Sequence, residues 1–183
     1  MPTIIIRPDG DTTIGNFSNT PINAVLSDSN DATFTNNTAQ NQSFIVSLDD
    51  VSLSGATFNS WSMTVRAKKG GKGNASCDAR LFDSSFAVNN ITSLSVTSSS
   101  YTDLSAGSAS FPGGFSNSDV NNLSVRVDTT GGTQVFISEI FVTIDYTAAV
   151  SGYGHDVNSV GSSSIGKINT VATANIGKVN SVD

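Results

Sequence analysis

The stretch VFISEIFVTIDY, residues 135–146, decides the fold. β-Branched and aromatic residues fill both faces of this run, and such residues favour strands over helices. A Thr-Gly-Gly-Thr turn at 130–133 comes just before it. The pattern predicts the central strand of the fold.

Shorter segments with period-two alternation surround this strand in the sequence. In 61–68, Trp61, Met63, Val65 and Ala67 alternate with polar residues, which is typical of a half-buried antiparallel strand. The Gly-rich loop 69–73 predicts a hairpin to a second strand at 75–81. Further strands are expected at 3–6, 43–48, 91–96, 101–104 and 123–127. About eight short strands with little helix predict an all-β fold, an antiparallel β-sandwich of jelly-roll type.

Composition excludes several classes of function. The formal charge is −6, and the only basic cluster, Lys68, Lys69 and Lys72, is a small one in a loop, so we expect no nucleic-acid partner. No apolar run approaches the length of a membrane span, and the N-terminus lacks a secretory pattern, so we expect synthesis in the cytoplasm in mature form and no membrane partner. One cysteine and one histidine exclude an intramolecular disulfide and a Cys/His zinc site. Cys77 is predicted to be a small buried residue on a strand.

The C-terminal segment repeats itself every 11 residues, with Ile-Gly-Lys at 165 and again at 176. We expect the sandwich to span 1–146, a connector 147–156, and an extended arm 157–183. Glycines and β-branched residues disfavour a helix there, and the apolar spacing switches parity, which disfavours a plain strand. The arm's apolar positions are Val157, Val160, Ile165, Ile168, Val171, Ile176, Val179 and Val182.

The arm has too few apolar side chains to offset the loss of backbone entropy on ordering, which costs about 1–2 kcal/mol per residue. The arm is therefore predicted to find its burial in neighbouring subunits, which implies a homo-oligomer.

Several stretches resemble jelly-roll structural proteins of tailed bacteriophages. These stretches are Arg-Pro-Asp-Gly at 7–10, residues 22–34, the strands at 61–68, 123–127 and 135–146, and the repeats IGKINTV and ANIGKVNSV. The resemblance implies a non-enzymatic virion protein on the particle surface, a capsid decoration or cement protein that forms a homotrimer. Its arm would hold it to neighbours and to the major capsid protein. The alternative is a tail-fibre or receptor-binding jelly roll that recognises host surface glycans.

Oxygen ligands for Ca²⁺ are available at 28–33, where Asp28, Asn30 and Asp31 lie in a tight turn. The loop is similar to the calcium loop of galactose-binding-type jelly rolls, in which a late-strand carboxylate, here Glu139, completes the shell. An Asx-turn whose side chains cap their own backbone is the alternative. Glu139 could equally pair with Arg66 or Arg126 across the sheet.

No pattern of catalytic residues stands out. Carboxylates are scattered without a distinctive pair, and no serine has a nucleophile-elbow context, so we expect no enzyme activity and no cofactor apart from the calcium alternative. His155, in the connector, is interpreted as a solvated or interface residue. Trp61 is predicted to be a core residue. Phe111 and Phe115 lie in a loop and must either fold back onto the sandwich or face a partner.

Overall fold

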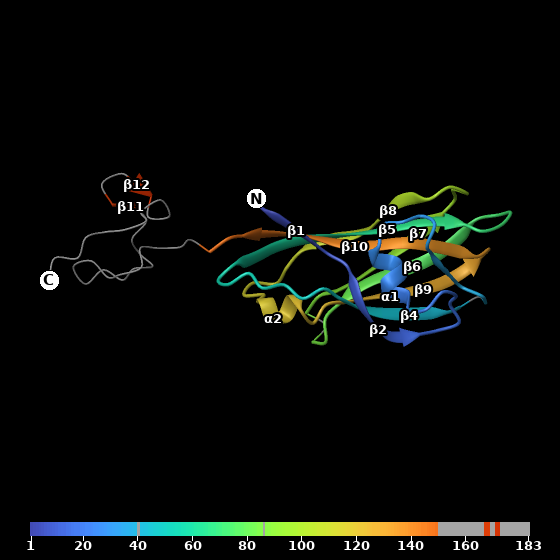
Figure 1. Cartoon of the computed structure of the whole chain (residues 1–183), viewed down its shortest axis with the longest axis horizontal. Helices are drawn as coiled ribbons and strands as arrows, with labels where there is room; N and C mark the ends of the chain where they lie inside the picture. The colour runs from blue at the N-terminus through green and yellow to red at the C-terminus, as the bar shows by residue number, and fades with distance from the viewer. Residues whose placement is uncertain (40, 86, 150–166, 169–170, 173–183) are drawn as a thin grey trace. The chain divides into compact units, whose positions relative to one another are not determined.

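Two antiparallel sheets lie face to face in the larger part of the chain (Figure 1). The first sheet has the order β1 (Thr3–Ile6), β10 (Val135–Thr147), β5 (Thr57–Lys69), β8 (Thr102–Ser110), and the short β3 (Thr35–Asn36) also pairs with β10. The second has the order β2 (Pro8–Ile14), β4 (Ser43–Leu48), β9 (Ser124–Gly132), β6 (Ala75–Phe82), β7 (Asn89–Val96). The fold is an antiparallel β-sandwich of jelly-roll type, as the sequence predicted.

The computed structural model describes residues 1–39, 41–85, 87–149, 167–168 and 171–172. The chain divides into two units, Met1–Thr147 and Ala148–Asp183. Within the second unit, β11 (Lys167–Ile168) pairs antiparallel with β12 (Val171–Ala172), so that Ile168 lies opposite Val171. At these four residues the chain forms a short ladder with itself, within the segment that the repeat pattern predicts as an extended arm.

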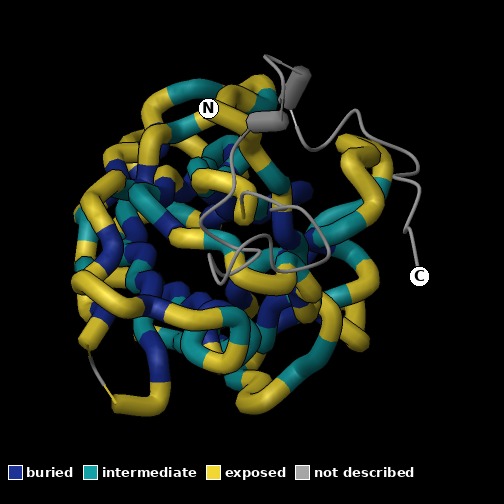
Figure 2. Tube along the Cα trace, turned by 90° about the vertical axis from the view of Figure 1, so that its left-hand side faces the viewer, coloured by how far each residue is buried: buried dark blue, intermediate teal, exposed yellow. Residues whose placement is uncertain are grey.

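The core fills the space between the sheets, where buried residues concentrate (Figure 2). Alternation along β10 brings Ile137, Ile140, Val142 and Ile144 inward with no side-chain exposure. A bulge between Ile137 and Glu139 inserts one extra residue, Ser138. Because the bulge shifts the two-residue period, Ile137 and Ile140 both reach the core while Glu139 turns to the outer face.

The predicted hairpin between 61–68 and 75–81 is wrong. β5 and β6 belong to different sheets, so the Gly-rich loop is a crossover between layers. Its backbone is held by neighbouring loops: Lys69 N–H donates to the Ser98 carbonyl at 2.9 Å and Gly70 N–H to the Gln134 carbonyl at 2.9 Å. Period-two patterning finds strands but does not assign a strand to a sheet.

Two short helices complete the larger unit. The first, α1 (Ile22–Ser27), buries Ile22 and Leu26, and the Asp11 carboxylate of β2 accepts from its first backbone N–H groups at 2.7–2.8 Å. The second, α2 (Asn117–Val120), begins with a capping box between Ser116 and Asp119. Hydrogen bonds from Ser116 lower the pKa of Asp119. Neither helix in the described part of the chain is long enough to cross a bilayer.

Candidate ligand site

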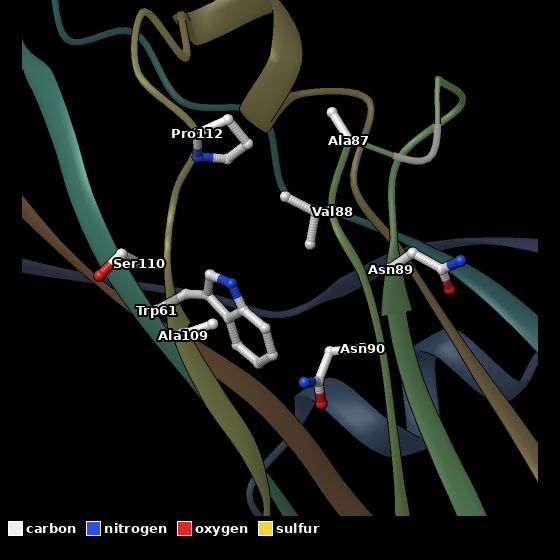
Figure 3. A pocket seen from close by; sticks show the side chains of 8 residues that line it. All are labelled: Trp61, Ala87, Val88, Asn89, Asn90, Ala109, Ser110 and Pro112. Carbon is white, nitrogen blue, oxygen red and sulfur yellow. The ribbon is translucent and has the colours of Figure 1, made fainter.

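A hollow of about 210 Å³ opens at the edge of the sandwich where β7 and β8 approach each other (Figure 3). Strand β5 provides the Trp61 indole. β8 and the residues after it provide Ala109, Ser110 and Pro112, and the β6–β7 connection with the start of β7 provides Ala87, Val88, Asn89 and Asn90. The two sheets therefore share this site.

Trp61 lies on the inner face of β5, opposite Ala109 of β8 and Ile144 of β10. The residue is only 2% exposed, which confirms the prediction that it belongs to the core. It also lines the hollow, which that prediction did not include. In Figure 3 the indole, the Ala109 methyl group and Val88 border the same space, so the wall is largely apolar.

A buried carboxylate holds the connection that carries Val88. Asp83, 2% exposed, accepts from the Val88 N–H at 3.0 Å and from the Ser85 hydroxyl at 2.5 Å, and its own N–H donates to the Val88 carbonyl at 3.1 Å. These bonds close the turn between β6 and β7. The position of Val88 in the wall is thus fixed by Asp83.

Close approach of β8 to β7 fixes the side chain of Asn90. Gly107 of β8 has φ +107°, and a Cβ atom there would lie 2.5 Å from Asn90 Oδ1 and 2.7 Å from Thr92 Oγ1. The Thr92 hydroxyl donates to Asn90 Oδ1 at 3.2 Å. Figure 3 shows the Asn90 amide nitrogen directed toward the indole, whereas the side chains of Asn89 and Ser110 point away from the hollow.

The proposed calcium loop lies elsewhere, against the outer face of the first sheet. Asp28 accepts from the Asn30 N–H at 3.0 Å and from the Thr33 hydroxyl, and Asn30 Oδ1 accepts from the Ala32 N–H at 3.0 Å. These contacts are the Asx-turn alternative, in which the side chains cap their own loop.

The other two candidate ligands form ion pairs with arginines instead. Asp31 binds Arg66 at 2.6 Å and accepts from the Ser138 hydroxyl at 2.8 Å, and the bond from Arg66 lowers the pKa of Asp31. Glu139 binds Arg7 at 2.9 Å and accepts from the Ser29 hydroxyl at 2.7 Å.

These contacts favour the Asx-turn alternative, and the calcium site stays a prediction. Within the described ranges no group of three or more His, Cys, Asp or Glu side chains could hold a metal ion, and the oxygens of Asp31 and Glu139 face guanidinium groups. Glu139 does lie opposite Arg66 in the strand register, but Arg66 binds Asp31 and Asp103, while Arg126 binds Asp128. The expected partners of Glu139 were wrong.

Beside this loop, three aromatic rings surround the ammonium of Lys68. It lies 4.3 Å from the centroid of the Tyr101 ring, 5.6 Å from that of Phe136 and 5.8 Å from that of Phe34. Burial raises the pKa of Tyr101 to about 12. Lys68 is thus held on the strand by cation–π contacts and not presented at a loop tip.

The loop phenylalanines fold back onto the sandwich. Phe111 and Phe115 are 7% and 8% exposed, and their rings stack with centroids 4.6 Å apart. Phe111 also meets Phe58 of β5 edge-on at 6.3 Å. The alternative of a partner-facing loop at these two residues is therefore wrong.

The remaining predicted positions lie outside the described residues, except for Ile168 and Val171 in the β11–β12 ladder. This applies to His155, to most of the connector, and to the arm residues Val157, Val160, Ile165, Ile176, Val179 and Val182.

No family model and no curated protein matches this sequence. Solved structures with a similar fold include a CBM6 domain of a marine laminarinase from Zobellia galactanivorans, at TM-score 0.47 and 10% identity, covering 78% of this chain and 98% of that one. Another is a CBM35 domain from Paenibacillus barcinonensis, at TM-score 0.43 and 12% identity, covering 81% and 99%. A GH26-CBM35 mannanase from Podospora anserina matches at TM-score 0.45 and 9% identity over 85% of this chain, which spans 30% of that enzyme. At such identities the likeness concerns the fold alone.

These comparisons correct the predicted function. The similar structures contain carbohydrate-binding modules and none is a phage protein, which contradicts the interpretation as a capsid decoration protein. Binding to a major capsid protein stays a prediction. The homo-oligomer and the location on a particle surface stay predictions.

Sequence reasoning missed most of the hollow. Asn90, Val88 and Ala109 carry no distinctive spacing, and they meet Trp61 only because the edges of two sheets converge. The available signals were that Trp61 is the single tryptophan and that Asn89-Asn90 interrupts the apolar pattern at the start of a strand.

Proposed function

We propose that this protein is a non-catalytic carbohydrate-binding module and that the hollow beside Trp61 holds one sugar residue. The observation that carries the proposal is the lining of the hollow: an indole with aliphatic neighbours forms one wall, and the amide of Asn90 projects into the space. Small-molecule sites typically combine a mainly apolar wall with a few placed polar groups. A sugar ring offers matching surfaces, with C–H groups on its faces and hydroxyl oxygens at its rim.

The size of the hollow favours a small ligand. About 210 Å³ is less than the roughly 300–1,000 Å³ of pockets that hold drug-sized molecules. A single pyranose residue is a better match than a longer segment of a glycan chain.

The lining also favours binding over cleavage. Glycoside hydrolysis uses two carboxylates that face each other across the sugar. Among the described residues that line the hollow there is no aspartate or glutamate. Asp83, behind the wall, has its oxygens engaged by Val88 and Ser85.

Tryptophan fluorescence tests the proposal directly, because Trp61 is the only tryptophan and lines the site. Titration with a panel of mono- and oligosaccharides should produce a saturable change in emission for at least one glycan. Ala109→Leu places a larger side chain beside the indole and should abolish that change. Ser108→Leu, on the neighbouring exposed residue paired with Ser62, is the matched control and should bind normally. If no glycan alters the emission of the wild-type protein, the proposed function fails.

A further inference from the structure

The hollow presents hydrogen-bond donors. The Thr92 hydroxyl donates to Asn90 Oδ1 at 3.2 Å, which orients the amide so that its Nδ2 group faces the indole. The indole N–H of Trp61 has no hydrogen-bond partner among the described residues, and Figure 3 shows its nitrogen on the side of the ring toward Pro112 and Val88. Both groups donate, so a ligand here must supply acceptor oxygens.

No residue of the lining carries a charge that could pair with a charged group of a ligand. The described lining residues are aromatic, aliphatic or amide- and hydroxyl-bearing, and none of them is ionisable. Two ionisable side chains lie near the wall. Asp83 accepts from the Val88 N–H, and the Arg80 guanidinium donates to Asn89 Oδ1 at 2.8 Å, on the side chain that points away from the hollow.

The geometry points to selection of a neutral sugar residue by the two donors, Trp61 Nε1 and Asn90 Nδ2, with rejection of the corresponding uronic acid. A uronate would have to desolvate its carboxylate without a cation to pair with, and that penalty exceeds what neutral donors return. The overall charge of −6 adds repulsion. This inference rests on the proposed function, because it names the class of sugar for the same site.

Matched pairs of methyl glycosides test the charge selection. The methyl glycosides of glucose, galactose, glucuronic acid and galacturonic acid are titrated against the wild-type protein at neutral pH, with Trp61 emission as the signal. Each neutral sugar that binds should do so at least about tenfold more tightly than its uronic acid. Equal or tighter binding of the uronic acids overturns the inference but leaves the proposed function intact. Failure of all glycans to bind overturns both.

Variants at Asn90 test the donor role. Asn90→Asp keeps the acceptor for Thr92 but removes the donors, and Asn90→Leu removes them without adding charge. Both should weaken neutral-sugar binding by roughly 3- to 10-fold. Ile91→Asp is the control: it adds the same charge at the next residue, which is 60% exposed on the opposite face of β7, and it should bind as the wild type does.

Two outcomes contradict the donor role. Unchanged affinity in Asn90→Leu would mean that the amide does not contact the sugar, and an equal loss in Ile91→Asp would mean that charge alone explains the effect. Thermal unfolding of each variant checks that the fold is retained.

Discussion

Gly107→Ala should disturb both the stability of the sandwich and its hollow. Gly107 has φ +107°, where an L-residue is strained by about 1–3 kcal/mol. The added methyl group would lie 2.5 Å from Asn90 Oδ1 and 2.7 Å from Thr92 Oγ1. Those atoms must move apart, which breaks the Asn90–Thr92 hydrogen bond at a cost of about 0.5–1.5 kcal/mol. We therefore expect the free energy of unfolding to fall by about 2–4 kcal/mol.

Gly73→Ala is the matched control for this change. Gly73 has a similar φ of +99°, but a Cβ atom there would meet nothing within 4 Å. Backbone strain and the smaller entropy of the unfolded chain act in both variants, so the difference between the two isolates the contact with β7. Gly107→Ala should be less stable than Gly73→Ala by about 1 kcal/mol or more.

Unfolding by denaturant and by heat, followed by Trp61 fluorescence, measures the stability of both variants. At about 2–4 °C per kcal/mol for a chain of this size, the melting temperature of Gly107→Ala should fall by roughly 5–15 °C. Its glycan affinity should also fall, because Asn90 is displaced, while that of Gly73→Ala should not. Equal stability and equal affinity in the two variants would refute the reasoning that β7 and β8 are held rigidly at this contact.

Four further changes follow from the described contacts. Removing either partner of the Arg7–Glu139 pair, as Arg7→Met or Glu139→Gln, should lower the free energy of unfolding by about 1–3 kcal/mol, and a double-mutant cycle in urea should give a favourable coupling energy. Asp83→Ala leaves a buried backbone N–H of the turn unpaired and should cost about 1–3 kcal/mol by thermal unfolding, with weaker glycan binding than the wild type. The pKa of Asp31 is lowered in the folded state, so the stabilisation by its carboxylate is present above the unfolded-state pKa and is lost as the pH falls through the folded-state pKa. The difference in free energy of unfolding between the wild type and Asp31→Asn, measured in urea, should therefore narrow from pH 7 to pH 3. A constant difference would contradict this. Burial raises the pKa of the Cys77 thiol to about 12, so a thiol reagent at pH 8 should label the native protein far more slowly than the urea-unfolded chain, and rapid native labelling would contradict that burial.

Local sequence was enough for most strands of the sandwich. Period-two alternation located β5, β6 and β9, because a strand with one buried face must place apolar side chains at every second residue, and β-propensity located β10. Strands were also expected at the positions of β1, β4 and β7. Alternation also placed Trp61 and Cys77 in the core. It missed β2, whose Pro8–Ile14 run has no such alternation, and the short helix α1, whose first backbone N–H groups are capped by Asp11 of the preceding strand.

Partner choice among charged groups could not be read from the chain. Glu139 and Arg66 are neighbours in the strand register. Even so, Glu139 forms its ion pair with Arg7, and Arg66 forms its ion pair with Asp31 of the loop at 28–33. Each of these ion pairs joins residues far apart in sequence. The local sequence pattern does not tell which basic side chain will pair with a given carboxylate.

The sequence by itself determined the all-β class, most strands and the burial of residues such as Trp61 and Cys77, because strand alternation and β-propensity act over a few residues. Only the tertiary structure decided that β5 and β6 lie in different sheets and that Asp31 of the loop at 28–33 pairs with Arg66. It also decided that Trp61, Asn90 and Ala109 line one hollow. The physical reason is that each of these features depends on how the edges of two sheets pack, and packing depends on long-range contacts that no local pattern records.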